Sequence, residues 1–479
     1  MTGGPMPRST HCACTSILVG KAATLDGSTL IARTEDNSCA CAPKRFTVVP
    51  DAAYDHELFT SANNGFALEL HGPALRYTST PEADSSEGLY EEAGINAAGV
   101  AMSATESTYA NERVLALDPL VEDGLAEDAL LSVVLPFITS ARDGVRRVGG
   151  IVAAHGSAES NSILFADADE VWYMELATGH HWVAQRIPDD AYAVCANRIS
   201  IQEVDFGSND FMASEDIRAF VDDNRLNPRP GTFDFRRIFG TYTQQDAHYN
   251  TPRVWFGQRA FSPEVEQNPE DLDLPFICRA NRLIGVDDVA SVLSSHFNGT
   301  PFDPLGSDGD ERSRGRYRAI SLSRTQEGHI LQIRPGMPAE RAGVHWVALG
   351  TTAFSPFVPF FANASSAHPV WEHTGARPET TSAYWLLRTL GMLTESRYAS
   401  ASKPVDDFLG ACRCKAHAFV ARTDATCAPL AGEALTEALT RENRAFMDEL
   451  LADLRTLLQD LVMAAAEDSR LSFAMDENL

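Results

Sequence analysis

The sequence predicts an α+β fold in which stacked sheets lie between layers of helices. Segments with the pattern of short strands fill the chain up to about Glu106 and return between residues 162 and 196. Each block of strands is followed by helical patterning, and a long helix predicted over Ala431 to Glu467 closes the chain. No low-complexity linker separates these blocks. Together they favour a layered α+β domain of one large piece.

The first block of strands begins with a hairpin. Asp26-Gly27 lies between two apolar segments rich in β-branched residues, which is a strong hairpin signal. A helix is predicted over Ala126 to Val148, and Pro136 inside it predicts a kink or a break. The strands predicted in this block are Thr15 to Val19, Thr29 to Ala32, Phe66 to Leu70 and Gly99 to Ser103.

Strands return in the segments SILFAD, EVWYMEL, HWVAQR and YAVCAN, each bounded by Asp, Gly or Pro. Helices are then predicted at Ser214 to Asp222 and Val286 to Ser295, and a strand pair at Arg318 to Ser323 and Gly328 to Ile333. The apolar stripe of the last helix is typical of core packing, with a homo-oligomer contact as the alternative. That stripe consists of Leu435, Leu439, Phe446, Leu450, Leu454, Leu457, Leu458 and Leu461.

The charge balance excludes several classes of partner. The 479 residues include 39 Lys+Arg and 66 Asp+Glu, which gives a net charge of −27. So acidic a chain is repelled by phosphate, which argues against binding to nucleic acid or to an anionic membrane surface. No segment has the roughly 18 apolar residues of a membrane span, and the N-terminus lacks a signal-peptide core. We therefore expect a cytoplasmic protein.

The nine cysteines do not suggest a disulfide framework, because their number is odd and no export signal accompanies them. Six of them form three C-x-C pairs, Cys12/Cys14, Cys39/Cys41 and Cys412/Cys414. Structural zinc sites normally use wider spacings with a second pair nearby. We therefore expect neither a metal nor an organic cofactor, and we expect ordinary partly buried thiols at all of these positions except one.

That exception is Cys14, at the start of the first strand of the hairpin. A two-residue turn would set Cys14 opposite position 39, and a loop over Thr24 to Gly27 would set it opposite position 37. Either register brings Asp36 within about one to three residues of Cys14, with Arg33 on the same strand as Asp36. A guanidinium and a carboxylate beside a cysteine lower its pKa and orient its partners. Taken alone, a surface ion pair explains Arg33 and Asp36 equally well.

The string CTSILVGKAATLDGSTLIARTEDN, Cys14 to Asn37, resembles the opening of the dipeptidase A family of cysteine N-terminal-nucleophile hydrolases, relatives of the penicillin V acylases and bile salt hydrolases. The resemblance covers most of the chain, from Cys14 to at least Asn363. Further matching strings are GINAAGVAMSATES, YNTPRVW, SRTQEGHILQIRP and WVALGTTAFSPFVPFFAN.

The resemblance implies a four-layer αββα sandwich and a nucleophile that is the first residue of the mature chain. Residues 1–13 are then a leader, and residues 14–479 are one large hydrolase domain. Removal of the leader exposes the α-amine of Cys14, whose ordinary pKa of roughly 8 suits a general base for its own thiol. Cys12 is a rival nucleophile, but Cys14 directly precedes the first strand as in the family pattern.

The resemblance also assigns roles to four other residues. Arg33 favours the thiolate, and Asp36 accepts a hydrogen bond from the Cys14 amine. Asn197 in CANRIS corresponds to an oxyanion-hole asparagine of the related acylases, which donates to the oxygen that gains charge during acyl transfer. Arg253 in YNTPRVW corresponds to a second active-site arginine. The structural alternatives are a strand-end turn for Asn197 and a surface salt bridge for Arg253.

One position departs from the acylase pattern. The acylases carry a second oxyanion asparagine ten residues after the Asn of an Asn-x-x-Gly turn, and the same count from Asn96 gives Glu106 here. An ionised glutamate cannot donate a hydrogen bond. We therefore expect Glu106 to bind the free ammonium of a peptide substrate, with a solvated surface glutamate as the alternative.

These inferences predict a cysteine dipeptidase that hydrolyses short peptides through an acyl-enzyme on Cys14. Three other functions compete with it. The first is an N-acyl amide hydrolase of the penicillin V or bile salt type, and the second is a non-catalytic regulator like the secernins. The third is a thiolate metal-binding protein built on the C-x-C pairs.

Overall fold

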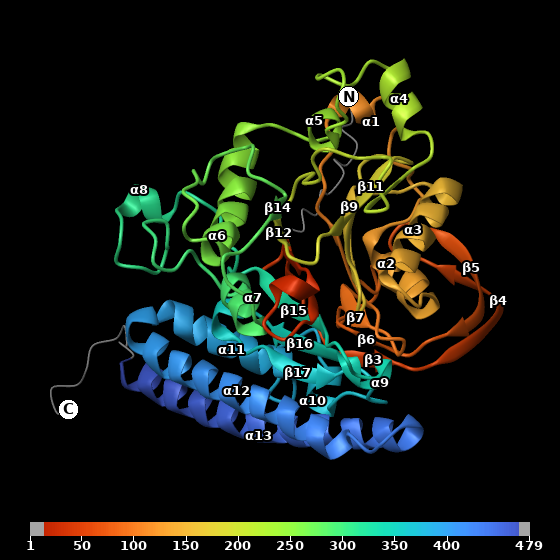
Figure 1. Cartoon of the computed structure of the whole chain (residues 1–479). Helices are drawn as coiled ribbons and strands as arrows, with labels where there is room; N and C mark the ends of the chain where they lie inside the picture. The colour runs from red at the N-terminus through yellow and green to blue at the C-terminus, as the bar shows by residue number, and fades with distance from the viewer. Residues whose placement is uncertain (1–13, 469–479) are drawn as a thin grey trace, which may run out of the picture.

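Two antiparallel sheets stacked face to face form the centre of the protein (Figure 1). The structure is a computed structural model that describes residues 14–468. The first sheet has seven strands in the order β14-β12-β1-β2-β15-β16-β17, and the second has six in the order β13-β11-β10-β9-β8-β7. Two smaller pairs, β3-β6 and β4-β5, flank them.

The strands alternate with turns over the first half of the chain and return near its middle. Their bounds are β1 (Thr15–Val19), β2 (Thr29–Asp36), β3 (Thr47–Val49), β4 (Ala52–Thr60), β5 (Ala67–Ala74), β6 (Tyr77–Ser79), β7 (Ala93–Ile95), β8 (Ala101–Glu106), β9 (Asn161–Ala166), β10 (Val171–Leu176), β11 (Trp182–Ile187), β12 (Tyr192–Cys195), β13 (Phe211–Ala213), β14 (Ile277–Cys278), β15 (Thr325–Ile333), β16 (Gly343–Leu349) and β17 (Val358–Phe361).

The helices lie mainly in the middle and at the end of the chain. Their bounds are α1 (Glu112–Leu115), α2 (Glu127–Val134), α3 (Ala141–His155), α4 (Ile217–Asp223), α5 (Phe235–Phe239), α6 (Thr251–Phe261), α7 (Val286–Leu293), α8 (Glu311–Arg314), α9 (Ala339–Ala342), α10 (Pro369–Glu372), α11 (Ala383–Ser396), α12 (Tyr398–Cys427) and α13 (Gly432–Glu467).

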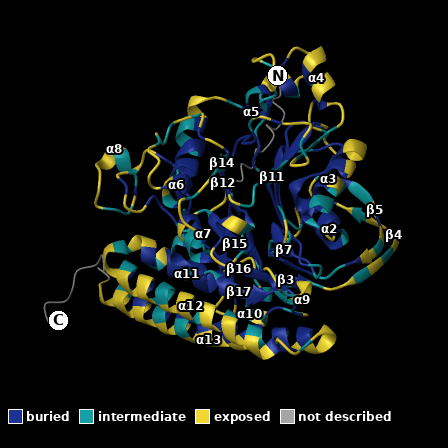
Figure 2. Cartoon of the chain, viewed as in Figure 1, coloured by how far each residue is buried: buried dark blue, intermediate teal, exposed yellow. Residues whose placement is uncertain are grey.

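Side chains that alternate along the strands divide the apolar core into three layers. Leu18 and Ile31 of the first sheet meet Leu164 and Tyr173 of the second in the layer between the sheets. On the outer face of the first sheet, strand residues such as Ile17 pack beneath α7 and the C-terminal helices α11, α12 and α13. The outer face of the second sheet is covered by α2 and α3. This arrangement confirms the expected four-layer αββα sandwich, in which most strands of the two large sheets are buried, while β4, β5 and the outer faces of α12 and α13 are exposed (Figure 2).

Most predicted elements are present. The helix predicted over Ala126 to Val148 is broken at Pro136 into α2 and α3, with a short 3-10 turn at Leu135–Phe137 between them. The long last helix is present as α13, and most of its apolar stripe is buried against the core. That burial confirms the core-packing interpretation of the stripe.

Two predictions at strands are wrong. Residues Arg318 to Ser323 form no strand: they lead as a loop from α8 into β15, tied to the chain after α7 by the Ser321 amide on the Ser295 carbonyl. Both registers considered for the first hairpin are also wrong. Thr15 pairs with Thr34 and Val19 with Leu30, because the connection is longer than expected and contains a 3-10 turn at Lys21–Ala23. Continuing this register by one residue sets Cys14 opposite Glu35, which is the residue before Asp36.

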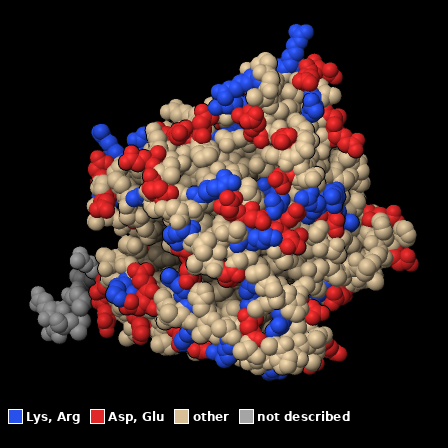
Figure 3. Space-filling view, viewed as in Figure 1, with Lys and Arg blue, Asp and Glu red and all other residues tan. Residues whose placement is uncertain are grey.

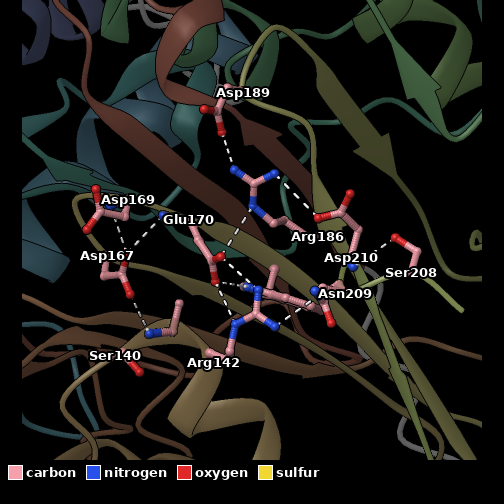
Figure 4. Close-up of polar contacts among 12 residues, drawn as sticks. Ser140, Arg142, Asp167, Asp169, Glu170, Arg186, Asp189, Ser208, Asn209 and Asp210 are labelled. Atoms are coloured by element: carbon pink, nitrogen blue, oxygen red, sulfur yellow. Dashed lines mark hydrogen bonds and ion pairs between the residues drawn. The ribbon is translucent and has the colours of Figure 1, made fainter.

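A network of ion pairs ties α3 to one end of the second sheet (Figure 4). Arg142, at the start of α3, forms a bidentate pair with Glu170 at 2.8 and 3.1 Å, and Arg186 of β11 lies 3.6 Å from the same carboxylate. The hydroxyl of Thr29 donates to the Asp167 carbonyl at 2.7 Å, which links the first hairpin to the second sheet. The Thr29 contact thus joins the two sheets, whereas the Arg142, Glu170 and Arg186 pairs hold α3 on the second sheet.

The described surface mixes both signs of charge on the face shown in Figure 3. Between residues 14 and 468, no helix combines the length and the apolar character needed to cross a membrane.

Candidate active site

Cys14 lies immediately before β1, a strand in the middle of the first sheet between β12 and β2. Strands on both sides of β1 fix its backbone, through Thr15↔Thr34 on one side and Ser16↔Cys195 on the other. The Cys14 side chain is 1% exposed. The sequence thus places a cysteine at a rigid strand end, inside the sandwich.

Two donors point at the Cys14 sulfur. Arg33 Nη1 donates to Sγ at 3.1 Å from β2, and Thr105 Oγ1 donates to it at 3.0 Å from β8 of the facing sheet. Hydrogen bonds from a cation and a hydroxyl are the contacts that stabilise a thiolate over a thiol. Both sheets therefore contribute to one sulfur-binding position.

Arg33 is itself fully buried and held along its other edges. Its Nε donates to Ser103 Oγ at 2.9 Å, and its Nη2 donates to Glu92 Oε2 at 2.5 Å and to the Glu92 carbonyl at 3.3 Å. Glu92 has a left-handed backbone with φ of 58°, a conformation that costs energy in a non-glycine residue. In this conformation, its carbonyl oxygen and its Oε2 atom both accept from Arg33 Nη2. Lys44 Nζ lies 3.6 Å from Glu92 and 2.9 Å from Glu35, so the pairing continues behind the site.

Burial dominates the ionisation of Cys14 in this chain. It raises the pKa of the thiol to about 12, against the opposing effect of Arg33 and of the Thr105 hydrogen bond; the charges of Glu127 and Asp36 raise it further. The cysteine is therefore protonated near neutral pH despite its donors. An added base is needed to ionise it.

The main chain of Cys14 is held from the other side of the first sheet by α6. Arg253 Nη1 donates to the Cys14 carbonyl at 2.7 Å and to Thr15 Oγ1 at 3.1 Å. Its Nη2 donates to Asn197 Oδ1 at 2.6 Å and to Asn250 Oδ1 at 2.9 Å. Arg253 is fully buried, so the surface salt bridge considered for it is wrong.

The Arg253 contact orients the amide of Asn197. With Oδ1 accepting from Arg253, the NH2 end of the amide is the end that donates elsewhere. Asn197 follows β12 in a loop held by Glu175, whose carboxylate accepts from the Ser200 and Ile201 amides at 2.6 and 3.1 Å. The loop therefore presents Asn197 from a fixed backbone next to Cys14's own strand.

Asp36 lies at the end of β2 and is fully buried. Its carboxylate accepts hydrogen bonds from Arg318 and from the hydroxyl of Thr325. Because residue 13 precedes Cys14 here, the Cys14 nitrogen is a peptide amide. The expected contact between Asp36 and a Cys14 amine therefore belongs to a chain that begins at Cys14, and it stays a prediction.

Glu106 ends β8, one residue after Thr105. Alternation along β8 places Thr105 between the sheets and Glu106 on the face covered by α2. Burial and the nearby charge of Glu159 raise the pKa of Glu106 to about 8. Its neighbour Glu127, at the start of α2, is also close enough to Cys14 to influence the thiol. No hydrogen bond joins Glu106 to Cys14 within the described residues.

The site thus contains residues that sequence reasoning missed. Thr105 and Ser103 lie inside the quoted string GINAAGVAMSATES, and the period-two alternation of a strand places them together on one face. Asn250 precedes Arg253 by three residues, the spacing of one helical turn. Arg318 carries no local signal, because its pairing with Asp36 joins segments far apart in the chain.

The C-x-C pairs lie away from this arrangement. Cys39, Cys41 and Cys414 are exposed, Cys412 is buried on α12, and every cysteine between residues 14 and 468 is a free thiol. Within the same part of the chain, no group of three or more His, Cys, Asp or Glu side chains is placed to hold a metal ion. Cys12 lies outside the described residues.

Comparison with known proteins places the chain among peptidases. Residues 13–410 match the sequence profile named "Peptidase family C69". The chain is 49% identical to a "Probable dipeptidase" of Latilactobacillus sakei, over 98% of both chains. It is 38% identical to "Dipeptidase A" of Lactobacillus helveticus, over 94% of this chain and 96% of that protein. A solved penicillin V acylase from Agrobacterium tumefaciens covers 72% of this chain and 84% of its own, at 13% identity and a TM-score of 0.30, too low to support any argument.

The contact from Thr105 to Cys14 makes a direct prediction. Thr105→Val removes the hydroxyl but keeps the shape of the side chain, so the Cys14 thiolate loses one of its two donors. We expect alkylation of Cys14 at pH 7 to slow by about tenfold, the effect of roughly one pKa unit. Peptide-resolved mass spectrometry after timed treatment with iodoacetamide measures this rate. Thr105→Ser, which keeps the hydroxyl, serves as the control. Equal alkylation rates for Thr105→Val and Thr105→Ser would show that the hydroxyl does not affect the ionisation of Cys14.

Proposed function

Because this chain belongs to peptidase family C69, we propose that it is a cysteine dipeptidase whose nucleophile is Cys14. The observation that carries the proposal is the pair of donors on the Cys14 sulfur, Arg33 from one sheet and Thr105 from the other. A buried structural cysteine needs no cation and no hydroxyl at its sulfur, whereas both groups stabilise a nucleophilic thiolate.

The reaction proceeds through a thioester. A base takes the Cys14 proton, and the thiolate attacks the scissile carbonyl to give a tetrahedral intermediate whose oxygen carries the new charge. The intermediate collapses as the C–N bond breaks, and the protonated base gives its proton to the leaving amine. Water, deprotonated by the same base, then attacks the thioester and releases the acid and the thiol. No cofactor takes part in these steps.

The base we propose is the α-amine of Cys14 itself, freed when residues 1–13 are removed as a leader. Two observations support it. No histidine between residues 14 and 468 donates to or accepts from the Cys14 sulfur, and burial keeps the pKa of the thiol near 12 while it lacks a base. The freed amine lies on the residue whose carbonyl is bound by Arg253. Removal of the leader thus creates the base at a position that is already fixed.

The remaining roles follow from the contacts. Arg33 stabilises the thiolate electrostatically, and Asp36 receives the freed amine as a hydrogen-bond acceptor. Asn197, its oxygen held by Arg253, donates from its NH2 group to the tetrahedral oxygen. Arg253 fixes both the Cys14 carbonyl and this asparagine, and so positions nucleophile and oxyanion donor relative to each other.

A comparison of dipeptide substrates tests the proposed activity. We expect the wild type to hydrolyse free dipeptides at a rate at least about a hundredfold above that of N-acetylated ones, and Cys14→Ala to show no turnover, because the acyl-enzyme cannot form. Amine release measured with a fluorogenic reagent gives both rates. Preference for the acetylated substrates would identify an N-acyl amide hydrolase. Absence of turnover with either class would indicate a non-catalytic, secernin-like protein.

Recognition of the free ammonium is the role we propose for Glu106. Burial and then the charge of Glu159 raise the pKa of Glu106, and burial together with the charges of Glu92, Glu159 and Glu106 raises that of Glu127, so like charges repel one another at the end of β8. A bound ammonium relieves that repulsion, which is the physical reason for placing a cation there. The acyl chains cleaved by an acylase supply no such charge.

For Glu106→Gln we expect the KM for a free dipeptide to rise by about tenfold while the rate with N-acetylated dipeptides stays low and unchanged, because the variant loses one charge-assisted hydrogen bond. Steady-state kinetics near pH 8 measure the effect. The matched control is Glu112→Gln, which removes the charge of an exposed glutamate at the start of α1, shortly after Glu106 in the sequence. Equal KM values for wild type and Glu106→Gln would leave Glu106 as a structural carboxylate.

The proposal also covers where the protein works and whether it associates with copies of itself. We propose that the protein works in the cytoplasm on short peptides, in keeping with its strongly acidic composition. We also propose that the protein forms a homo-oligomer, since the end of α13 exposes the apolar side chains of Val462 and Met463.

A further inference from the structure

Behind Arg33 lies a second hydrogen-bonded chain that the proposed reaction does not use. Ser103 Oγ, which accepts from Arg33 Nε, lies 2.9 Å from His329 Nε2, and His329 Nδ1 lies 2.8 Å from Glu327 Oε1. Ser103 comes from β8 of the second sheet, whereas His329 and Glu327 come from β15 of the first. All three side chains are fully buried. The arrangement therefore runs from the nucleophile through Arg33 and across the gap between the sheets.

The direction of each proton in this chain is determined by chemistry. A guanidinium N–H only donates, so the Ser103 hydroxyl accepts from Arg33. A carboxylate at Glu327 only accepts, so a neutral His329 carries its proton on Nδ1 and donates it to Glu327, which leaves Nε2 to accept the proton of the Ser103 hydroxyl. Burial and the charge of Arg33 both lower the pKa of His329, in agreement with a neutral ring. Each member fixes the orientation of the next.

The strand register explains why the chain reaches Arg33. His329 pairs with Arg33 across β15 and β2, so their side chains leave the sheet on the same face and side by side. Ser103 is opposite them on the facing sheet and occupies the space between the two side chains. Without an acceptor on its Nε edge, the guanidinium would be held by Glu92 alone and would be free to turn away from the sulfur.

We propose that Ser103, His329 and Glu327 are positioning residues that keep the Arg33 guanidinium aimed at the Cys14 sulfur and so set the ionisation of the nucleophile. The inference rests on the proposed role of Cys14. His329 acts through Ser103 and Arg33 and touches neither the sulfur nor the substrate, so it is not the missing general base. The hydrogen-bonded series ends at Glu327, which pairs with Glu35 in the register of β15 and β2 and lies close enough to Lys44 to feel its charge.

Other charged groups surround this chain and do not replace it. On the Arg33 side, Glu92 pairs with the Nη2 edge of the guanidinium. Lys44 pairs with Glu92 and with Glu35 and contacts neither Ser103 nor His329. On the β16 side stands His345, whose ring centre is 6.2 Å from that of His329 and whose Nδ1 is 3.0 Å from Thr78 Oγ1. His345 therefore offers a buried histidine of similar surroundings that lies outside the chain.

Two substitutions of His329 separate its two contacts. The amide of His329→Gln reaches the position of Nε2 and can accept from Ser103, whereas the amide of His329→Asn reaches the position of Nδ1 and can donate only to Glu327. Positioning through Ser103 therefore predicts that Asn loses the effect and that Gln recovers most of it. Ser103→Ala removes the acceptor for Arg33 outright, and His345→Gln is the matched control.

The readout is the rate of Cys14 alkylation by iodoacetamide as a function of pH, resolved from the other cysteines by peptide mass spectrometry on the protein as purified, with its N-terminus read from the intact mass of each variant. For Ser103→Ala and His329→Asn we expect the apparent pKa of Cys14 to rise by about one unit and the rate at pH 7 to fall by about tenfold. His329→Gln should stay within about threefold of wild type, and His345→Gln within about twofold. Thermal unfolding of each variant shows that it is folded.

The outcomes distinguish this inference from the dipeptidase proposal. If His329→Asn and His329→Gln change the pH profile equally, or if Ser103→Ala leaves it at the wild-type position, the positioning role is refuted whatever the substrate. If the variants behave as expected but no dipeptide is hydrolysed, the positioning role stands and the proposed activity fails. In an active enzyme, Ser103→Ala should lower kcat and leave KM unchanged, since it affects the nucleophile and not substrate binding.

Discussion

The burial of the Arg33 guanidinium between two sheets is the constraint on which the rest of the site depends. A charge removed from water is tolerated only when its donors are satisfied, because an unpaired buried ion costs several kcal/mol, on the order of 3–5. Arg33 meets this demand with Glu92 on one edge, Ser103 on another and the Cys14 sulfur on the third. The positions of these three groups fix the spacing of the sheets at this end, and the Thr29 hydroxyl on the Asp167 carbonyl joins the sheets at the other.

The two faces of the first sheet divide the work around Cys14. On the inner face, Arg33 and Thr105 act on the sulfur, where charge develops on the nucleophile. On the other side, Arg253 of α6 holds the Cys14 carbonyl and the Oδ1 atom of Asn197, the residue that we propose as oxyanion donor. Since β1 is paired on both sides, neither set of contacts can move without disturbing the sheet. Such rigidity is what electrostatic stabilisation of a transition state requires.

Local sequence signals predicted much of this arrangement. Strand patterning in the sequence predicted β1, β2, β12 and β15 of the first sheet and β8, β9, β10 and β11 of the second, and Pro136 marked the break between α2 and α3. The resemblance of the opening string drew attention to Cys14 and Arg33, which the structure joins at 3.1 Å. The site residues that local patterns did not reveal are brought together by contacts between segments far apart in the sequence. Ser103 and Thr105 face Arg33 and Cys14 only because the second sheet stacks on the first, and His329 adjoins Arg33 only through the β2–β15 register. The long helix α12, with many polar residues and Pro404, has no apolar stripe strong enough to reveal it.

The central claim is that Cys14 becomes the first residue and supplies its own base. Its most direct test is the intact mass of the purified wild-type protein beside that of Cys14→Ala. The account predicts that the wild type begins at Cys14 and that the variant retains residues up to Ala13, because a chain without the nucleophile cannot process itself. If both proteins retain those residues, the Cys14 nitrogen remains an amide, and the proposed base is contradicted.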